Sequence, residues 1–145
     1  MRPRRPFLLA LGLCAAAALA PPRRAWAPPV YRVIVHPDLP YSSLERRLVT
    51  DLFLKKTTRW PNGEAAHPVD LPSESPVRQR FSEEVLGRSV AAVKSYWQQL
   101  IFAGRGVPPP ELESDQEVLS FVLRHPGGIG YVAGPAPGAR VVNVH

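Results

Sequence analysis

Two serine hydroxyls stand close to an arginine in the segment LPSESPVRQRF, residues 71–81. Ser75 precedes Pro76, whose fixed φ suits the first position of a helix, so the segment predicts a helix with Ser75 as its N-cap. The N-terminus of a helix favours an anion, because its first N–H groups are unpaired and its dipole is positive there. Arg78 could bind an oxyanion in a bidentate way, with Ser73 as a further donor. An oxyanion site is one interpretation of this loop, and an ordinary cap beside a solvated arginine is the other.

A second basic loop, AGRGVPPP, follows a predicted helix and carries Arg105 between two glycines. Gly104 and Gly106 would let the backbone approach a ligand closely while Arg105 supplies charge. The same pattern is typical of a helix C-cap and exit turn. Both interpretations stay open at this point.

Residues that commonly catalyse reactions are present but scattered. The four histidines show no metal-ligand spacing, and the chain has no G-x-S-x-G nucleophile elbow. Asp38, Asp51 and Asp70 stand in no recognisable relation to a nucleophile. We therefore expect a protein that is not an enzyme and that uses no metal or cofactor.

Residues 1–27 have the layout of an export signal to the periplasm, with a basic start, an apolar run from Phe7 to Ala20 and then small residues. The apolar run is shorter than the roughly 20 residues that span a bilayer. Within this leader, the segment RRPFLL resembles a twin-arginine export signal, although paired arginines also occur in ordinary leaders. Cleavage after residue 18 or after residue 27 would remove Cys14, the only cysteine, so we expect no disulfide.

The net charge of +6 belongs mainly to this leader. Five arginines and no acidic residue precede residue 28, which leaves +1 on residues 28–145. A nearly neutral domain does not favour a nucleic-acid surface. Because 45% of the 145 residues are hydrophobic, we expect residues 28–145 to form one compact domain.

Strand and helix patterns alternate beyond the leader. The predicted strands are 31–37, 67–72, 129–134 and 139–145, and the predicted helices are 42–56, 75–87, 89–104 and 115–125. The third of these helices has the strongest apolar periodicity, and we expect it to be the best buried. Ser42 with Glu45, and Ser114 with Glu117, stand in the S-x-x-E relation of a capping box. The alternation predicts the α/β class, with a three-layer αβα domain and a mainly parallel sheet.

Four segments, taken in order, carry a resemblance to a known family: DLFLKKTTRWPNG, VDLPSESPVRQRF, YWQQLIFAGRG and HPGGIGYV. Together they resemble the small, single-lobe relatives of phosphate ABC-transporter substrate-binding proteins, which are type II periplasmic binding proteins. The resemblance runs from about Val33 to Val132 and implies one αβα lobe. Lys55 stands where that family usually has glycine. Trp60 then fits a core role at the end of the preceding helix, with its indole N–H free to meet a carbonyl or water, rather than ligand stacking.

The resemblance also implies a ligand, because larger members close two lobes on phosphate. Their Ser-Gly-Thr loop is matched only at Ser75, since Pro76 and Val77 replace the glycine and threonine and Glu74 adds negative charge. The candidate ligand-binding residues are Ser73, Ser75, Val77, Arg78 and Arg105.

The function so implied is solute binding, of phosphate or another oxyanion, in connection with the membrane component of an ABC transporter. One lobe would need a homodimer or another second-lobe partner to supply the opposite wall. The alternative is a lobe that has lost its ligand and binds an envelope protein.

Overall fold

The computed structural model describes residues 30–145. The predicted export signal, with its cleavage point and Cys14, lies outside the described residues. Residues 30–145 contain no helix with the length and apolar character needed to span a bilayer. The elements are β1 (Arg32–Val35), β2 (Ser43–Leu44), α1 (Arg46–Phe53), β3 (His67–Pro68), α2 (Pro76–Phe81), the π-helical turn η1 (Ser82–Leu86), α3 (Val90–Phe102), α4 (Asp115–Arg124), β4 (Gly128–Val132) and β5 (Arg140–Val144).

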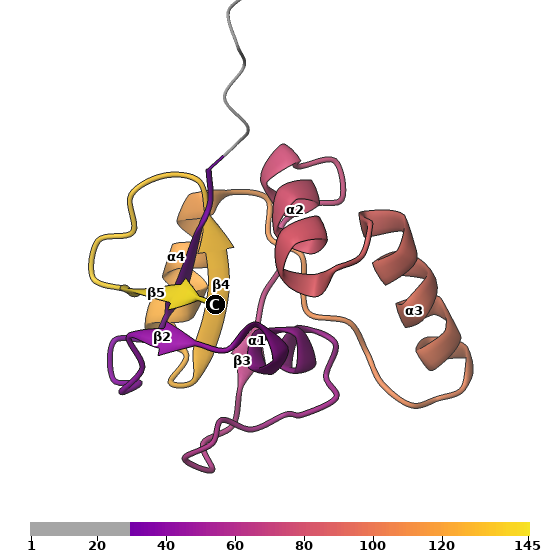
Figure 1. Ribbon diagram of the computed structural model, residues 1–145, viewed down its shortest axis with the longest axis horizontal. Coiled ribbons are helices and arrows are strands. Elements are labelled where there is room, and N and C mark those ends of the chain that lie inside the picture. The colour runs from indigo at the N-terminus through magenta and orange to yellow at the C-terminus, as the bar shows by residue number, and fades with distance from the viewer. Residues whose placement is uncertain (1–29) are drawn as a thin grey trace, which may run out of the picture.

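Five strands form one mixed sheet in the order β2-β5-β1-β4-β3 (Figure 1). The edge strands β2 and β3 run parallel to β5 and β4, whereas the central strand β1 runs antiparallel to both of its neighbours. Four strands therefore share one direction and β1 alone opposes them. The run Val33 to Val35 is buried throughout, as a strand covered on both faces requires. The α/β class and the largely parallel strand direction are confirmed.

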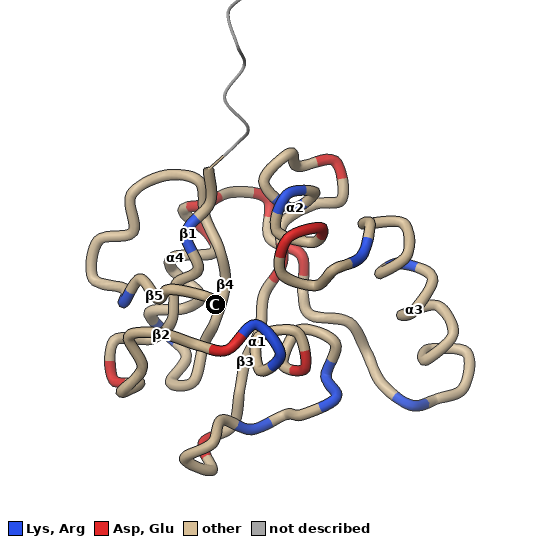
Figure 2. Tube along the Cα trace, in the orientation of Figure 1, with Lys and Arg blue, Asp and Glu red and all other residues tan. Residues whose placement is uncertain are grey.

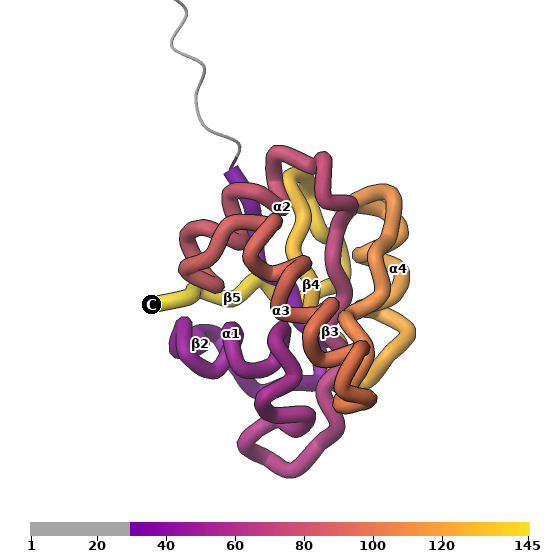
Figure 3. Tube along the Cα trace, turned by 90° about the vertical axis from the view of Figure 1, so that its right-hand side faces the viewer, coloured from indigo at the N-terminus to yellow at the C-terminus, as the bar shows by residue number. Residues whose placement is uncertain are grey.

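Helices cover both faces of the sheet, which gives the three expected layers (Figures 1 and 3). Gly130 and Tyr131 are neighbours on β4 and so point to opposite faces. Tyr131 stacks on Phe81 of α2, with 3.9 Å between the ring centroids. Gly130 faces α4, where an added Cβ would lie 2.7 Å from Cγ1 of Val118. The absence of a side chain at Gly130 thus lets α4 pack closely on the sheet.

The start of α1 differs from the prediction. The proposed capping box of Ser42 and Glu45 is wrong, because the helix begins at Arg46 and Glu45 makes no side-chain cap hydrogen bond. The intervening residues form β2 instead, and the carbonyl of Ser42 accepts the N–H of Asn143 at 3.1 Å. Pairing with the C-terminal strand satisfies backbone groups of β5 that a longer helix would leave unpaired.

The other predicted helix starts are confirmed. α2 and α4 begin after the N-caps Ser75 and Ser114, and each serine Oγ accepts the backbone N–H three residues later. In the second box, Glu117 accepts the N–H of Glu113 rather than that of Ser114 itself. Both helices are therefore fixed by local chemistry that the sequence makes visible.

The expectation that α3 is the best-buried helix is wrong. Only Val93 and Trp97 are buried in it, whereas Ile101 and Phe102 are 52% and 98% exposed. α3 lies at the side of the domain, beyond η1 rather than on the sheet (Figure 1). Periodicity predicted an apolar stripe, but it could not show how much of that stripe another element covers.

Trp60 has the predicted core role. It is 2% exposed, its indole N–H donates to the carbonyl of Gly127 at 2.9 Å, and its ring stacks on Tyr41. Lys55 has a φ of 52°, the one positive value at a non-glycine residue between residues 30 and 145. The chain turns at Lys55 itself, which explains why a glycine would suit this position.

Candidate functional site

The loop from β3 to α2 carries most of the predicted ligand residues, and its hydroxyls already have partners. Ser75 Oγ accepts the N–H of Arg78 at 3.3 Å, and Ser73 Oγ donates to the carboxylate of Glu74 at 3.3 Å. Val77 is half-buried and packs against the core. Pro76 has no N–H, so the backbone of this first turn offers fewer donors than an ordinary helix start.

Arg78 is buried in a cluster of charged groups. Its side chain is 8% exposed, with one guanidinium nitrogen 3.3 Å from the Asp70 carboxylate. The other nitrogen donates to the Glu111 carboxylate at 2.5 Å and to the carbonyl of Leu71 at 2.6 Å. The sequence predicted two alternative roles for Arg78, an anion ligand or a solvated surface residue, and both require that its guanidinium is accessible to solvent. In the structure two carboxylates neutralise it and hold it inside the domain.

Tyr131 completes the cluster, since its hydroxyl donates to the Asp70 carboxylate. Burial raises the pKa of Asp70, and the nearby Arg78 guanidinium and the Tyr131 hydrogen bond only partly oppose that shift. Burial alone would lower the pKa of Arg78, but Asp70 and Glu111 outweigh it and the pKa is raised. Burial and Asp70 together raise the pKa of Tyr131.

The cluster joins segments that are distant in the sequence. Asp70 donates its N–H to the carbonyl of Pro110 and its carbonyl accepts the N–H of Leu112, so Asp70 and Glu111 form a parallel bridge just beyond the end of β3. Arg78 then fastens the start of α2 to this edge. Sequence analysis missed the cluster because no local spacing links Asp70, Glu111 and Tyr131. The one visible signal was an acidic residue inside the apolar strand segment 67–72.

A groove of about 490 Å³ opens where the N-termini of α2 and α4 face the same surface. We call it the α2–α4 groove; its lining residues are Leu71, Pro72, Glu74, Ser75, Val77, Glu113, Ser114 and Asp115. Three of these are acidic and none is basic. The Asp115 carboxylate accepts the N–H groups of Ala133 and Gly134 at 3.0 and 2.9 Å, so it already occupies two donors that could meet an anion. The groove therefore has two favourable helix ends and an unfavourable side-chain charge for an oxyanion.

Arg105 follows the C-terminal end of α3 and is not among the residues that line this groove. The N–H of Arg105 reaches the carbonyl of Leu100 and the N–H of Gly104 reaches that of Ile101, at 2.9 and 3.0 Å. With Gly104 at a φ of 66°, these bonds form a Schellman C-cap. The exit-turn interpretation is confirmed, and the structure does not bring Arg105 together with Ser75.

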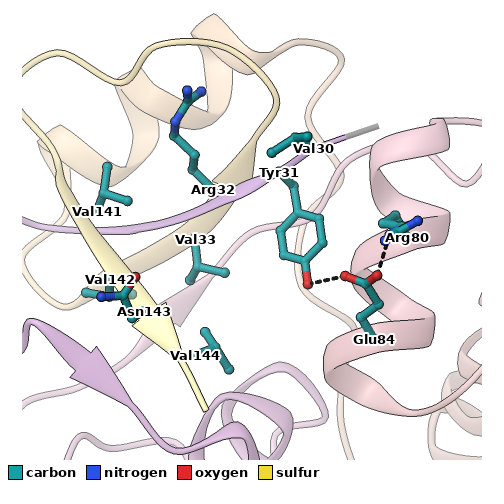
Figure 4. A pocket seen from close by; sticks show the side chains of 10 residues that line it. All are labelled: Val30, Tyr31, Arg32, Val33, Arg80, Glu84, Val141, Val142, Asn143 and Val144. Atoms are coloured by element: carbon teal, nitrogen blue, oxygen red, sulfur yellow. Dashed lines mark hydrogen bonds and ion pairs between the residues drawn. The ribbon is translucent and has the colours of Figure 1, made fainter. Parts of the chain in front are cut away.

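A second groove lies between the diverging ends of β1 and β5 and the side of α2 and η1 (Figure 4). Two of its three charged groups pair with each other: Glu84 pairs with Arg80 and also accepts the hydroxyl of Tyr31 at 2.9 Å. Burial and Glu84 raise the pKa of Tyr31 to about 12. Arg32 donates to the carbonyls of Ala133 and Gly134. Among the residues that line this groove, Arg32 is therefore a cation without a carboxylate partner.

Among residues 30–145, no group of three or more histidine, cysteine, aspartate or glutamate side chains is placed to hold a metal ion.

Comparison with solved structures finds the same fold in receptors of phosphate transport. An ABC-type phosphate transport receptor from Vibrio cholerae superposes with a TM-score of 0.59 at 13% identity, over 79% of this chain and 45% of that one. A putative phosphate ABC transporter substrate-binding protein from Clostridium perfringens, with bound phosphate, gives 0.60 at 19% identity, over 79% and 44%. PstS from Borrelia burgdorferi gives 0.60 at 12% identity, over 79% and 47%. No protein-family model and no curated protein matches the chain.

These likenesses confirm the fold that the sequence resemblance implied. The chain spans less than half the length of each of these receptors, and the likeness at 12 to 19% identity concerns architecture. It leaves the ligand to be argued from the chain's own residues.

Proposed function

We propose that this chain is an exported, non-enzymatic solute-binding protein whose single lobe binds phosphate or a related oxyanion, in connection with uptake by an ABC transporter. One observation carries the proposal: 79% of the chain has the fold of phosphate transport receptors, one of which holds phosphate. The export signal predicted from residues 1–27 would place such a protein in the periplasm, where a transporter's membrane component could receive the solute.

The ligand would lie at the N-terminus of α2, at the mouth of the α2–α4 groove. The donors available there are the N–H of Val77 and the hydroxyls of Ser73 and Ser75, which would turn from their present partners to the oxyanion. Arg78 would act by fixing the loop, since its charge is already balanced. Because the groove is open, a second copy or another protein would have to supply the opposite wall.

A second candidate function is that of a protein-interaction module that retains the lobe without its ligand. It is favoured by the charge of the α2–α4 groove, where Glu74, Glu113 and Asp115 repel an anion and would attract a basic partner. Both candidates use the same surface, but only the first predicts that this surface binds phosphate. A phosphate titration therefore separates them.

The experiment is calorimetric titration of the purified chain with phosphate and, for comparison, sulfate, at low and moderate salt. Solute binding predicts selective heat with a Kd in the micromolar range, about −8 kcal/mol. The double variant Ser73→Ala with Ser75→Gly should weaken binding at least tenfold, which is about 1.4 kcal/mol, because glycine largely keeps the cap but removes the hydroxyl. Ser89→Gly is the matched control, since it alters an equivalent cap on α3. Absence of heat at millimolar phosphate would contradict solute binding and favour the second candidate, a protein-interaction module.

A further inference from the structure

The end of α3 exposes more large apolar surface than any other part of residues 30–145. Ile101, Phe102 and Val107 are 52%, 98% and 66% exposed, and every residue from 101 to 108 is exposed. We call residues 101–108 the α3 tip. The tip projects from the side of the domain at the end of a helix that packs mainly on η1 (Figure 1). A fully exposed phenylalanine at a projecting turn marks a contact surface.

The charge around the tip has one sign. The segment from residue 87 to residue 110 contains Arg88, Lys94 and Arg105 and no acidic residue (Figure 2). Acidic side chains lie in other parts of the domain, for example in η1 and along the α2–α4 groove. An apolar tip flanked only by cations complements a surface that is both apolar and anionic.

Two features argue against a second copy as the occupant. Antiparallel pairing through α3 would place Arg105 of each copy beside Arg88 of the other, because these residues flank the two ends of the helix. Parallel pairing would bring each Lys94 to its equivalent. Three apolar side chains on a convex turn also fall well short of the roughly 800 Å² per partner that stable protein interfaces bury. A lipid surface needs no matching pocket, because inserted side chains meet fluid acyl chains while cations meet phosphate groups.

We propose that the α3 tip is a membrane-docking site that inserts Phe102, with Ile101 and Val107, into the interface of an anionic phospholipid bilayer. Lys94 and Arg105 meet the lipid phosphates from the flanks of the tip. The contact is peripheral and reversible, since the inserted group is a few side chains rather than a helix. It orients the lobe with the end of α3 toward the membrane, whereas the loops that lead into α2 and α4 and line the α2–α4 groove lie toward the other end of the domain (Figure 1).

The test uses the full chain and a local probe, so that an apolar leader cannot imitate the result. Phe102→Trp places an indole at the tip, and Val141→Trp places one at a half-exposed valine on β5, outside the tip. Each variant is mixed with vesicles of phosphatidylglycerol and phosphatidylcholine, roughly one part to three, that contain brominated acyl chains. The wild-type emission is subtracted from both. We expect at least a twofold quenching of the indole at 102 and none at 141, with quenching lost on pure phosphatidylcholine and at high salt.

Two further variants test the contributions separately. Phe102→Ser should lower the partition onto anionic vesicles at least threefold relative to Val141→Ser, and Lys94→Gln with Arg105→Gln should flatten its salt dependence. Equal quenching at positions 102 and 141, or no quenching at 102, would overturn the proposal. So would a dimer, seen by sedimentation without lipid and abolished by Phe102→Ser, because it would assign the tip to a second copy.

Discussion

The buried cluster of Arg78 makes the sharpest test of how this lobe is held together. In Arg78→Met the stem is kept and the guanidinium is lost, so the Asp70 side chain, 7% exposed, stays buried without its cation. Removing one partner of a buried pair costs about 3–5 kcal/mol. Protonation limits this loss: from the ordinary pKa of 3.8, keeping Asp70 protonated at pH 7 costs about 4 kcal/mol at 1.36 kcal/mol per pH unit. We therefore expect the free energy of unfolding to fall by about 3–4 kcal/mol at pH 7.

The same reasoning fixes the pH dependence and its sign. Burial raises the pKa of Asp70, so between the unfolded and folded pKa values the native state holds more protons and stability falls as pH rises. Without Arg78, whose charge opposes that shift, the pKa of folded Asp70 rises further and the fall in stability extends to higher pH. At pH 4 the unfolded carboxyl is itself about half protonated, and the variant should lose only about 1 kcal/mol, from the unpaired carbonyl of Leu71.

The assay is urea denaturation followed by tryptophan fluorescence, at pH 4 and pH 7. Arg80→Met is the matched control, because Arg80 lies on the same helix and forms a more exposed pair with Glu84, worth under about 1 kcal/mol. Adding Asp70→Asn to Arg78→Met should abolish most of the extra pH dependence, since the buried carboxyl is gone. A loss at pH 7 below about 1 kcal/mol, or an equal loss at both pH values, would refute the reasoning.

Three other substitutions test local features by the same denaturation measurement. Lys55→Gly should raise stability by about 0.5 kcal/mol, because relief of the left-handed backbone exceeds the entropic cost of glycine; a loss would contradict the strain at this turn. Trp60→Phe should cost about 1–3 kcal/mol, since the carbonyl of Gly127 keeps only its bond from the N–H of His67 and the smaller ring leaves a void in the core; no change would mean that the core closes around the smaller ring. Gly130→Ala should cost about 1–3 kcal/mol through contact with Val118; a neutral result would show that α4 can shift.

Several elements were predictable because their signals are local. The serine N-caps of α2 and α4 and the α/β alternation each depend on residues within a few positions of one another. The core role of Trp60 followed from the family resemblance, and its partner Gly127 is distant in the sequence. The single-lobe fold followed from the order of four short segments, and the structural comparisons agree with it. The ligand residues remain a prediction, because the loop that carries them is only partly like the family pattern.

Sequence by itself determined where α2 and α4 begin, that strands alternate with helices, and which side chains could form a core, since these are properties of spacing and residue type. Only the tertiary structure decided three further points: that β2 replaces the start of α1, that α3 leaves Phe102 exposed, and that Arg78 is enclosed by Asp70 and Glu111. Each depends on contacts between segments tens of residues apart. Burial and charge pairing are set by those contacts, and no local pattern records them.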